Sequence, residues 1–268
     1  MNDALYIAAT GMQTQQLAVD TISNNLANAQ TPGFKSGRVN FQELMYRDVA
    51  AHDQASHAAN ARPGIDDVPS AGLEQGSGVG VASMFKDFTA GVVATSGGAM
   101  NIAIKGDGFL EVQAADGSTA YWRGGLLQVN AEGWLATAQG QVLKPQIRVD
   151  AKAGDLVIGA DGTVSIRKKV AADVEVGQLS LQVFSNPAGL RPLGDALYQA
   201  SPASGDASPV RASDAGAGQL VQGGVEQSNV NLVDEMVNLM MAQRAYEMNV
   251  KVIQAADEMV GMSNNLRK

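Results

Sequence analysis

The sequence NVNLVDEMVNLMMAQRAYEMN, residues 229–249, decides how this chain is organised, because it lies in one long helix that we predict for Gly224 to Lys268. Side chains recur there at alternating steps of four and three residues, the spacing of a coiled-coil seam. The seam consists of Leu232, Met236, Leu239, Gln243, Tyr246, Val250, Ile253, Asp257 and Val260. A second row on a neighbouring face consists of Met241, Ala245, Met248, Val252, Ala255, Met259, Met262 and Leu266. One row packs against one partner helix, so two rows predict several partners.

A second strong helix is predicted for residues 3–29, near the other end of the chain. Its seam repeats the same spacing and consists of Leu5, Ala8, Met12, Gln15, Val19, Ile22 and Leu26. Thr31-Pro32-Gly33 ends this helix, because proline disfavours helix at the residue before it and glycine adopts turn geometry freely. Asn229 or Asn231 is expected to cap the C-terminal helix. Since the two seams match, we expect the terminal helices to pair with each other.

The middle of the chain has the pattern of β structure. From Asn101 to Tyr198, alternating segments are separated by turn sequences such as Asp116-Gly117 and Asp161-Gly162, which favour tight hairpins over metal-binding loops. Val79 to Val93 is also expected to form strands, and Phe41 to Val49 is expected to be either helical or extended. Residues 199–219 are rich in Ser, Ala, Gly and Pro, and we interpret them as a linker.

These patterns together predict an α+β protein, in which long terminal helices form a coiled-coil pair beside a central all-β domain of hairpins joined by extended linkers. Three parts are expected. Residues 1–33 and 225–268 form a terminal-helix domain. Residues 34–95 and 199–224 connect it to the rest, and residues 96–198 form the β domain.

The composition argues against catalysis. The chain has 268 residues, a net charge of −8, no cysteine, and only two histidines, His52 and His57, in a polar segment. The acidic balance leaves no basic footprint for nucleic acid. The segment QGSGVGV, residues 75–81, lacks the Gly-Lys-Ser/Thr of a phosphate loop. We therefore expect no catalytic residue, no cofactor and no metal. The N-terminus does not have the pattern of a cleaved secretion signal, and no stretch is long enough to span a membrane.

Three separated motifs resemble those of the flagellar rod, hook and hook-filament axial proteins. SNNLANAQTPGFK (23–35) is similar to the N-terminal signature of that family, and the sequence from Ser228 to Asn249 is similar to the C-terminal one. AIKGDGFL (103–110) and DGSTAYWR (116–123) resemble the central β domain. Within the family, LYIAATGM (5–12) and QRAYE (243–247) resemble distal-rod members more than proximal-rod members, and another axial subunit is the alternative.

The resemblance implies a structural subunit of the distal rod that polymerises helically into a hollow, rigid shaft and transmits torque. It further implies export by the flagellar type III apparatus without signal cleavage, a location in the basal body from the periplasm to the outer membrane, and contacts with rod, hook and ring proteins. The segment from Asp48 to Gly72 departs from the expected pattern, since it is rich in Ala and contains both histidines.

The seams and the resemblance predict that the functional site is the helical surface. Its interface residues are Leu5, Ala8, Met12, Val19, Ile22, Leu26, Leu232, Met236, Leu239, Met241, Met248, Val250, Val252, Ile253, Met259, Val260, Met262 and Leu266. An enzyme or a soluble binding module with a helical hairpin is the alternative from another class. Because a single subunit cannot bury both rows, we expect the terminal helices of a free subunit to be largely mobile.

Overall fold

The protein is described here in a computed structural model that covers residues 2–44, 46–48, 74–114, 116–149, 155–167 and 174–265. Two compact units make up the chain. Unit 1 comprises Met1–Ser23, Arg38–Met84 and Val233–Lys268, and unit 2 comprises Asn24–Gly37 and Phe85–Leu232. The chain therefore passes between the units near residues 23, 37, 84 and 232.

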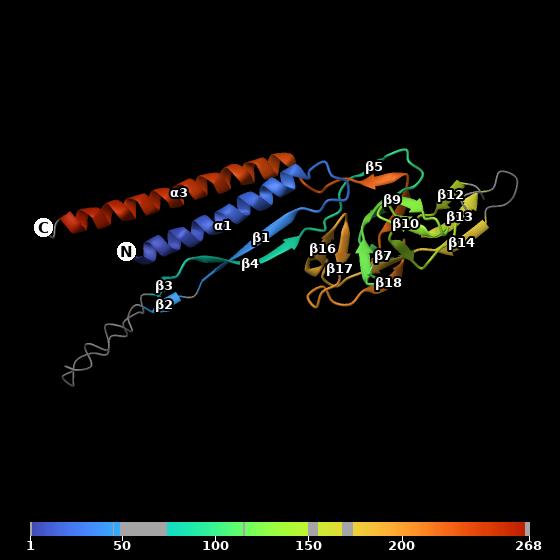
Figure 1. The fold of residues 1–268 in the computed structure, drawn as a ribbon, viewed down its shortest axis with the longest axis horizontal. Coiled ribbons are helices and arrows are strands. Elements are labelled where there is room, and N and C mark those ends of the chain that lie inside the picture. The colour runs from blue at the N-terminus through green and yellow to red at the C-terminus, as the bar shows by residue number, and fades with distance from the viewer. Residues whose placement is uncertain are drawn as a thin grey trace, which may run out of the picture. The chain divides into compact units, whose positions relative to one another are not determined.

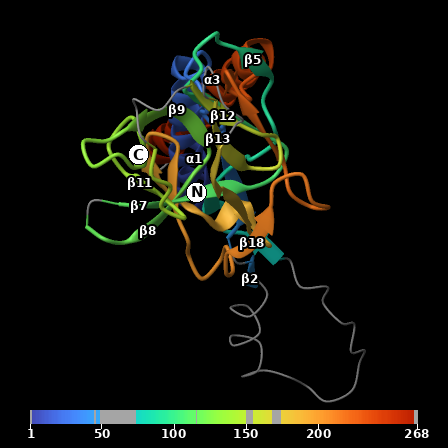
Figure 2. The same ribbon diagram turned by 90° about the vertical axis from the view of Figure 1, so that its right-hand side faces the viewer.

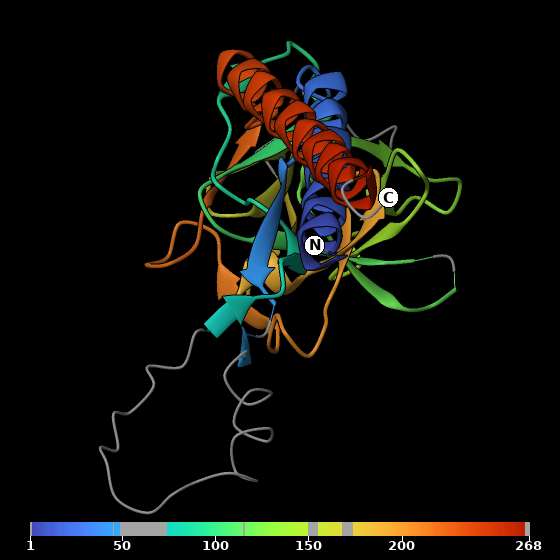
Figure 3. The same cartoon turned by 90° about the vertical axis from the view of Figure 1, so that its left-hand side faces the viewer.

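Unit 1 is built on the two predicted helices. Helix α1 spans Asn2–Ala27 and helix α3 spans Leu232–Asn265. The helices lie side by side and run in opposite directions (Figure 1). The N-terminal end of α1 and the C-terminal end of α3 therefore point the same way (Figure 3). The expectation of a helix near each terminus is confirmed. A regular coiled-coil pairing between the two helices stays a prediction.

Short strands accompany the helices in unit 1. Strand β1 (Gly37–Glu43) pairs with β4 (Val79–Lys86), and β2 (Tyr46–Asp48) pairs with β3 (Glu74–Gly76). The segment from Phe41 is thus extended up to Glu43, one of the two options that its sequence allowed. Gly78 sits against α1, since a Cβ on it would lie 2.5 Å from the Thr10 hydroxyl oxygen. The two histidines and almost all of the atypical segment 48–72 lie outside the described residues.

Unit 2 is a β structure, as predicted. Its main sheet has 11 strands, in the order β16-β17-β8-β7-β11-β10-β9-β6-β19, with β15 joining β7 to β18. Figure 2 looks onto this unit, where β7 lies between β8 and β11. A second sheet contains β12, β13 and β14, and β20 pairs with β5. The register-defined pairings in these sheets are antiparallel, such as Leu110 opposite Trp122 and Leu220 opposite Ile104.

The remaining elements have the following bounds. They are β5 (Val93–Thr95), β6 (Asn101–Lys105), β7 (Phe109–Gln113), β8 (Thr119–Trp122), β9 (Gly124–Val129), β10 (Leu135–Thr137), β11 (Val142–Lys144), β12 (Asp155–Ile158), β13 (Thr163–Arg167), β14 (Val174–Gln178), β15 (Ser180–Val183), the 3-10 helix η1 (Pro187–Gly189), β16 (Arg191–Gly194), β17 (Leu197–Gln199), β18 (Ser208–Arg211), β19 (Gln219–Gln222) and β20 (Gly224–Glu226).

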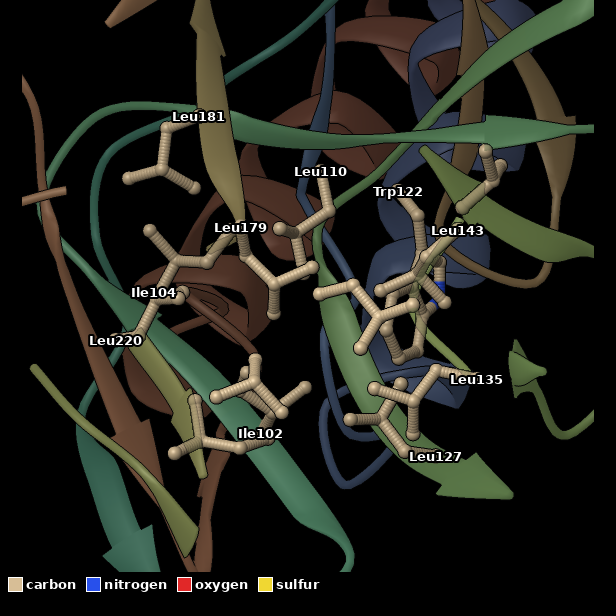
Figure 4. Packing of buried hydrophobic residues seen from close by; sticks show 14 of the residues in the cluster. Ile102, Ile104, Leu110, Trp122, Leu127, Leu135, Leu143, Leu179, Leu181 and Leu220 are labelled. Atoms are coloured by element: carbon tan, nitrogen blue, oxygen red, sulfur yellow. The ribbon is translucent and has the colours of Figure 1, made fainter. Parts of the chain in front are cut away.

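The hydrophobic core of unit 2 forms where the inward-facing residues of these strands meet (Figure 4). Ile102, Ile104 and Leu110 are completely buried there, together with Leu135 and Leu143. A smaller aromatic cluster packs Phe109 edge-on against Phe88, Phe184 and Tyr198, with ring centroids 5.4–5.7 Å apart. Because this core closes within unit 2, the unit buries its own apolar surface.

Two of the Asp-Gly sequences form the tight turns that were predicted. Asp116 accepts hydrogen bonds from the backbone and hydroxyl of Ser118, in the turn between β7 and β8. Asp161 accepts the same pair of bonds from Thr163, between β12 and β13. Both carboxylates are used within their own turns, which supports the structural reading of these sequences over a metal loop.

Three local expectations are corrected by the structure. Residues 199–219 are not a plain linker, because Ser208–Arg211 forms β18 against β15 and β19 begins at Gln219. Pro209 lies in β18, an edge strand, where a missing N–H is tolerated. The long helix begins only at Leu232, since Gly224–Glu226 is strand β20. Asn229 does not cap it, because its side chain bonds to Ser36, Asp87 and Thr89 instead.

Candidate functional site

Helix α3 presents a narrow buried line to the rest of unit 1. Its most buried side chains are Glu235, Ala242 and Ala256, which are 2–8% exposed. The contact with α1 is close, because a Cβ added to Gly11 would lie 2.9 Å from the amide nitrogen of Asn249. Ala242, Asn249 and Ala256 recur every seven residues and have small or polar side chains. The buried side of α3 therefore combines small and polar side chains, and at Asn249 it approaches α1 closely.

The predicted seam of α3 is displaced from this buried line by one residue. Met236, Gln243 and Asp257 of the predicted seam directly follow the buried Glu235, Ala242 and Ala256. Seam residues Leu232, Met236 and Val260 are 40–55% exposed, while Leu239, Val250 and Ile253 are half-buried. The spacing favoured the larger side chains, whereas the most buried side chains of α3 include the small Ala242 and Ala256.

The second row of α3 lies on the exposed side of the helix. Met241 and Met248 are 57% and 64% exposed, Val252 and Met259 are each 49% exposed, and Met262 is 59% exposed. At 100° per residue these side chains fall within about 80° of one another, on a face that borders the buried line through Ala242 and Ala256. Leu266, the last member of the row, lies outside the described residues. The structure thus leaves a continuous apolar row uncovered by its own chain.

The predicted seam of α1 lies toward the covered side of its helix. Ala8 is 4% exposed, and Leu5, Met12, Val19, Ile22 and Leu26 are half-buried. Thr14 on another face is also buried, and Thr10 approaches the glycine turn at Gly78. Helix α1 is therefore covered on two sides, whereas α3 is covered on one.

A buried ion triad in unit 2 was not predicted from the sequence. One carboxylate oxygen of Glu226 accepts a hydrogen bond from the ammonium of Lys35 at 2.7 Å. The other accepts one from Nε of Arg123 at 3.1 Å. All three side chains are at most 3% exposed. Residues 191 positions apart in sequence thus meet in one ionic contact.

The triad contains two cations and one anion, and backbone oxygens compensate the excess positive charge. Arg123 donates to the carbonyl oxygens of Gly106 and Gly108, and Lys35 donates to that of Thr89. The Gly106-Asp107-Gly108 segment does not close a hairpin, because β6 and β7 pair with other strands and not with each other. Its glycine carbonyls accept the hydrogen bonds of Arg123 instead. Buried ionic groups with every polar partner supplied are stable, whereas a partly satisfied set is costly.

Burial and charge act in opposite directions on the triad. Burial alone would raise the pKa of Glu226, but the positive charge of Arg123 and the hydrogen bond from Lys35 outweigh it, so the pKa lies below its usual value. For Lys35, burial is the largest effect and lowers its pKa, although Glu226 partly offsets it. Lys35 and Glu226 form a salt bridge at 2.7 Å, so the charge of each group favours the charged form of the other.

The triad fastens together the chain segments that lead into the helices. Residues 33–37, 85–91 and 226–229 meet at it. The amide of Gly33 donates to the carbonyl of Glu226 at 2.7 Å, and the amide of Gly91 donates to its carboxylate at 2.9 Å. Asn25 exchanges two hydrogen bonds with the backbone of Gly37. The triad is therefore the point in unit 2 where both terminal segments are fixed to the β structure.

The side chains of the triad carried weak signals in the sequence. Lys35 and Arg123 each end a quoted motif, TPGFK and DGSTAYWR, but a lone cation is more often exposed than buried. Glu226 lies just before the C-terminal motif, which begins at Ser228. No periodicity links residues this far apart, so the contact required the tertiary structure.

The described residues contain no cluster of three or more His, Asp or Glu side chains that is suited to a metal ion. Within the same ranges, no helix is long and apolar enough to cross a membrane. The exposed helical surface and the buried triad are thus the two candidate features that the described residues present.

Family models match three parts of the chain. Residues 5–35 match the model described as flagella basal body rod protein, residues 103–166 match the D1 domain of the flagellar hook protein FlgE/F/G, and residues 221–266 match the C-terminal model of the flagellar basal body rod FlgEFG proteins. These segments contain all three triad residues, with Lys35 in the first, Arg123 in the second and Glu226 in the third.

Full-length relatives agree with the family models. The chain is 40% identical to the flagellar basal-body rod protein FlgG of Agrobacterium fabrum, over 98% of this chain and 99% of the relative. It is 39% identical to FlgG of Buchnera aphidicola subsp. Schizaphis graminum, over 97% and 98%. It is 32% identical to the flagellar basal-body rod protein FlgF of Caulobacter vibrioides, over 97% and 95%.

Proposed function

The chain belongs to the flagellar basal-body rod protein family, and from this membership we propose that the exposed apolar row of α3 is the surface through which subunits polymerise into the rod. The protein is a structural subunit of the distal rod of the bacterial flagellum and is not an enzyme. It belongs to the flagellar basal body and assembles with rod and hook components. The more distant match to FlgF favours a distal over a proximal subunit.

The observation that carries the proposal is the exposure of the second row of α3. Met241, Met248, Val252, Met259 and Met262 are each about half exposed or more. Monomeric soluble proteins rarely leave such a continuous apolar row in water, and rows of this kind mark protein interfaces. Leu266 completes this row, and the other predicted interface residues, which come from the two seams, remain part of the proposed helical interface.

The contacts between subunits are proposed to be head-to-tail. A patch that meets a different patch on the next copy generates an open helix when the rotation does not close. Here the exposed row of α3 is one patch, and the face around Tyr6 on α1, which is 58% exposed, offers another. A hollow, stiff shaft that transmits torque follows from many copies joined in this way.

The finer assignments of domain, route and partner belong to the proposal as well. We infer an inner part made of residues 1–33 and 225–268, a connecting part made of 34–95 and 199–224, and a β domain made of 96–198. The subunit is exported by the flagellar type III apparatus without signal cleavage, and the shaft runs from the periplasm to the outer membrane inside ring proteins. The family membership supports these statements, and the location of a labelled subunit in isolated basal bodies tests them.

Substitution of one residue on the exposed row tests the proposed interface. Met248→Glu places a charge in the row, and we expect polymerisation and motility to be lost, because burying an unpaired carboxylate is strongly unfavourable. Gln254→Glu is the matched control, since Gln254 is exposed on the same helix but outside the row. The measurements are sedimentation of polymer and swimming in a strain that carries only the variant. Normal rods made from the Met248→Glu protein would exclude this surface as the interface.

A further inference from the structure

The methionines of this chain are concentrated on one helix. Six of the 11 methionines lie in α3. All six are exposed: Met236, Met240, Met241, Met248, Met259 and Met262 range from 49% to 64%. At 100° per residue, they cover less than half of the helix circumference, and the buried Ala242 and Ala256 lie outside that arc. Helix α3 thus presents a thioether-lined face to solvent.

Other methionines have different environments. Met100 is partly buried against the core of unit 2, and Met12 is half-buried on α1. Met84 on β4 is 59% exposed, but it lies outside the helical row. Oxidation of methionine follows exposure, so an oxidant reaches α3 and Met84 before it reaches Met12 or Met100.

We propose that the exposed methionines of α3 form an oxidation site, at which a peroxide converts the polymerising face of the free subunit into one that does not assemble. The inference rests on the proposed function of this face as the contact between subunits. The chemical class of the modifying agent is a peroxide, with hydrogen peroxide as the simplest member.

The reaction is a two-electron oxygen transfer. The thioether sulfur attacks one oxygen of hydrogen peroxide and forms a sulfur–oxygen bond, while the oxygen–oxygen bond breaks. Methionine is oxidised to the sulfoxide, and hydrogen peroxide is reduced to water. The sulfoxide is polar and is reversible by the methionine sulfoxide reductases. No metal or cofactor of the protein takes part.

The effect on assembly follows from burial of the new oxygen. In the free subunit each sulfoxide points into water, so oxidation leaves the fold of the subunit nearly unchanged. At the contact, each sulfoxide oxygen would lie among apolar side chains such as Val237 and Val252, without a hydrogen-bond donor. One unsatisfied polar group of this kind weakens association about tenfold or more, and Met241, Met248, Met259 and Met262 multiply the effect along the row.

Peroxide is expected to oxidise these methionines in the unassembled subunit and to spare them in the polymer. Once subunits have polymerised, the row is covered, and its sulfur atoms are shielded from the oxidant. We therefore expect rapid oxidation of the free chain and slow oxidation of the same methionines in the polymer. Met84 provides an internal reference in both states, because it belongs to β4 and not to the row.

The experiment uses the purified full-length chain treated with hydrogen peroxide and then freed of oxidant. Peptide mass spectrometry gives the extent of oxidation at each methionine, and circular dichroism reports helix content. The critical concentration for polymerisation is then measured by sedimentation and electron microscopy. We expect it to rise at least about tenfold after oxidation and to return after treatment with methionine sulfoxide reductases.

Two variants locate the effect. The sixfold leucine variant carries Met236→Leu, Met240→Leu, Met241→Leu, Met248→Leu, Met259→Leu and Met262→Leu, and it should polymerise equally well with and without peroxide, because leucine keeps the face apolar. The variant with Met84→Leu and Met100→Leu should lose assembly on oxidation as the natural chain does. Unchanged polymerisation of the natural chain with its α3 methionines fully oxidised would overturn the inference, and so would an equal loss in the sixfold leucine variant.

Comparing the Met248→Glu variant with the oxidised natural chain separates failure of the oxidation proposal from failure of the proposed function. If Met248→Glu still polymerises, the face is not the interface and both ideas fall. If Met248→Glu blocks polymerisation but oxidised protein assembles normally, the interface stands and only the oxidation site is lost. Should the sixfold leucine variant fail to assemble untreated, recovery of the oxidised natural chain by the reductases decides the matter, and absence of recovery overturns the inference.

Discussion

At the scale of single residues, Glu226 is the carboxylate on which three distant parts of the chain depend. It binds Lys35 from the N-terminal segment and Arg123 from the β structure, and its own backbone carbonyl accepts from Gly33. The side chain is 3% exposed, so water does not replace any of these contacts. A buried carboxylate between two cations holds its neighbours in place only while it remains charged.

Neutralising Glu226 is expected to destabilise unit 2. Glu226→Gln leaves Lys35 and Arg123 buried without a counter-charge, and removing one partner of a buried ionic group costs about 3 kcal/mol or more of the free energy of unfolding. Chemical denaturation followed by circular dichroism measures the difference. The control is Lys144→Met, which removes the pair with Glu111 at 3.3 Å, where the two side chains are 36% and 23% exposed. That loss should stay below about 1 kcal/mol.

The same variant gives a pH dependence with a defined sign. The pKa of Glu226 is lower in the folded chain than its ordinary value of 4.5. The unfolded chain therefore binds more protons in that range, and the stabilisation by Glu226 is present above pH 4.5 and is lost as the pH falls through the folded pKa. The stability difference between the natural chain and Glu226→Gln should shrink on acidification below pH 4.5. A difference that stayed constant across this range would contradict the role of the charge.

At the scale of secondary-structure elements, α3 shows that spacing and burial are separate properties. Large apolar residues recur in rows along α3, but the line buried within the chain runs through Ala242 and Ala256. Close contact at Gly11 and Asn249 favours small side chains between the helices. Large side chains such as Met241 and Met248 are left for contacts outside the single chain.

Two hairpin turns share the sequence Asp-Gly, and they are expected to respond differently to substitution of the glycine. Gly117 and Gly162 each follow an aspartate and have a φ of +81° and +88°. A Cβ on Gly117 meets nothing within 4 Å, whereas one on Gly162 would lie 2.3 Å from the carbonyl oxygen of Leu179. Gly117→Ala should cost about 1 kcal/mol for the left-handed backbone alone.

The cost at the second turn should be larger. Gly162→Ala carries the same backbone strain, and its new methyl group must also displace the backbone carbonyl of Leu179. We therefore expect the free energy of unfolding to fall by about 3 kcal/mol in total. Thermal unfolding of the two variants, compared in one buffer, measures the difference. Equal losses would show that the neighbouring backbone moves aside freely.

At the scale of the whole molecule, the two units differ in how much of their apolar surface they bury. Unit 2 closes a core of fully buried aliphatic residues around Ile104, Leu110 and Leu135. Unit 1 leaves many large apolar side chains of α3 exposed, including Val233 at 68% and Met248 at 64%. A helix with little buried area opens readily, because packing supplies most of the stability of a helix.

Hydrogen exchange of the verified monomer tests this difference. Backbone amides of α1 and α3 should exchange much faster than those of β6 to β9, and should become protected once polymer forms. Amides of β7, whose strand is completely buried at Leu110 and Val112, serve as the slow reference in both states. Strong protection of residues 5–26 in the free subunit would contradict the expected mobility of the terminal helices.

Most of the architecture was accessible from local sequence. Residue spacing marked α1 and α3, the Asp-Gly turns marked hairpins such as those at Gly117 and Gly162, and Thr31-Pro32-Gly33 marked the end of the first helix. These signals are readable because helix periodicity and turn geometry depend on neighbours only a few residues away. Composition alone misread residues 199–219, since an edge strand such as β18 tolerates Ser and Pro.

The sequence by itself determined the two terminal helices, the β structure between them, and the apolar rows that lie along α3. Only the tertiary structure decided which line of side chains on α3 is buried, because burial depends on where the rest of the chain approaches the helix and not on residue spacing. It alone brought Lys35, Arg123 and Glu226 into one contact. An ion triad leaves no periodic trace in the chain, since its members are joined by the fold and not by their distance in sequence.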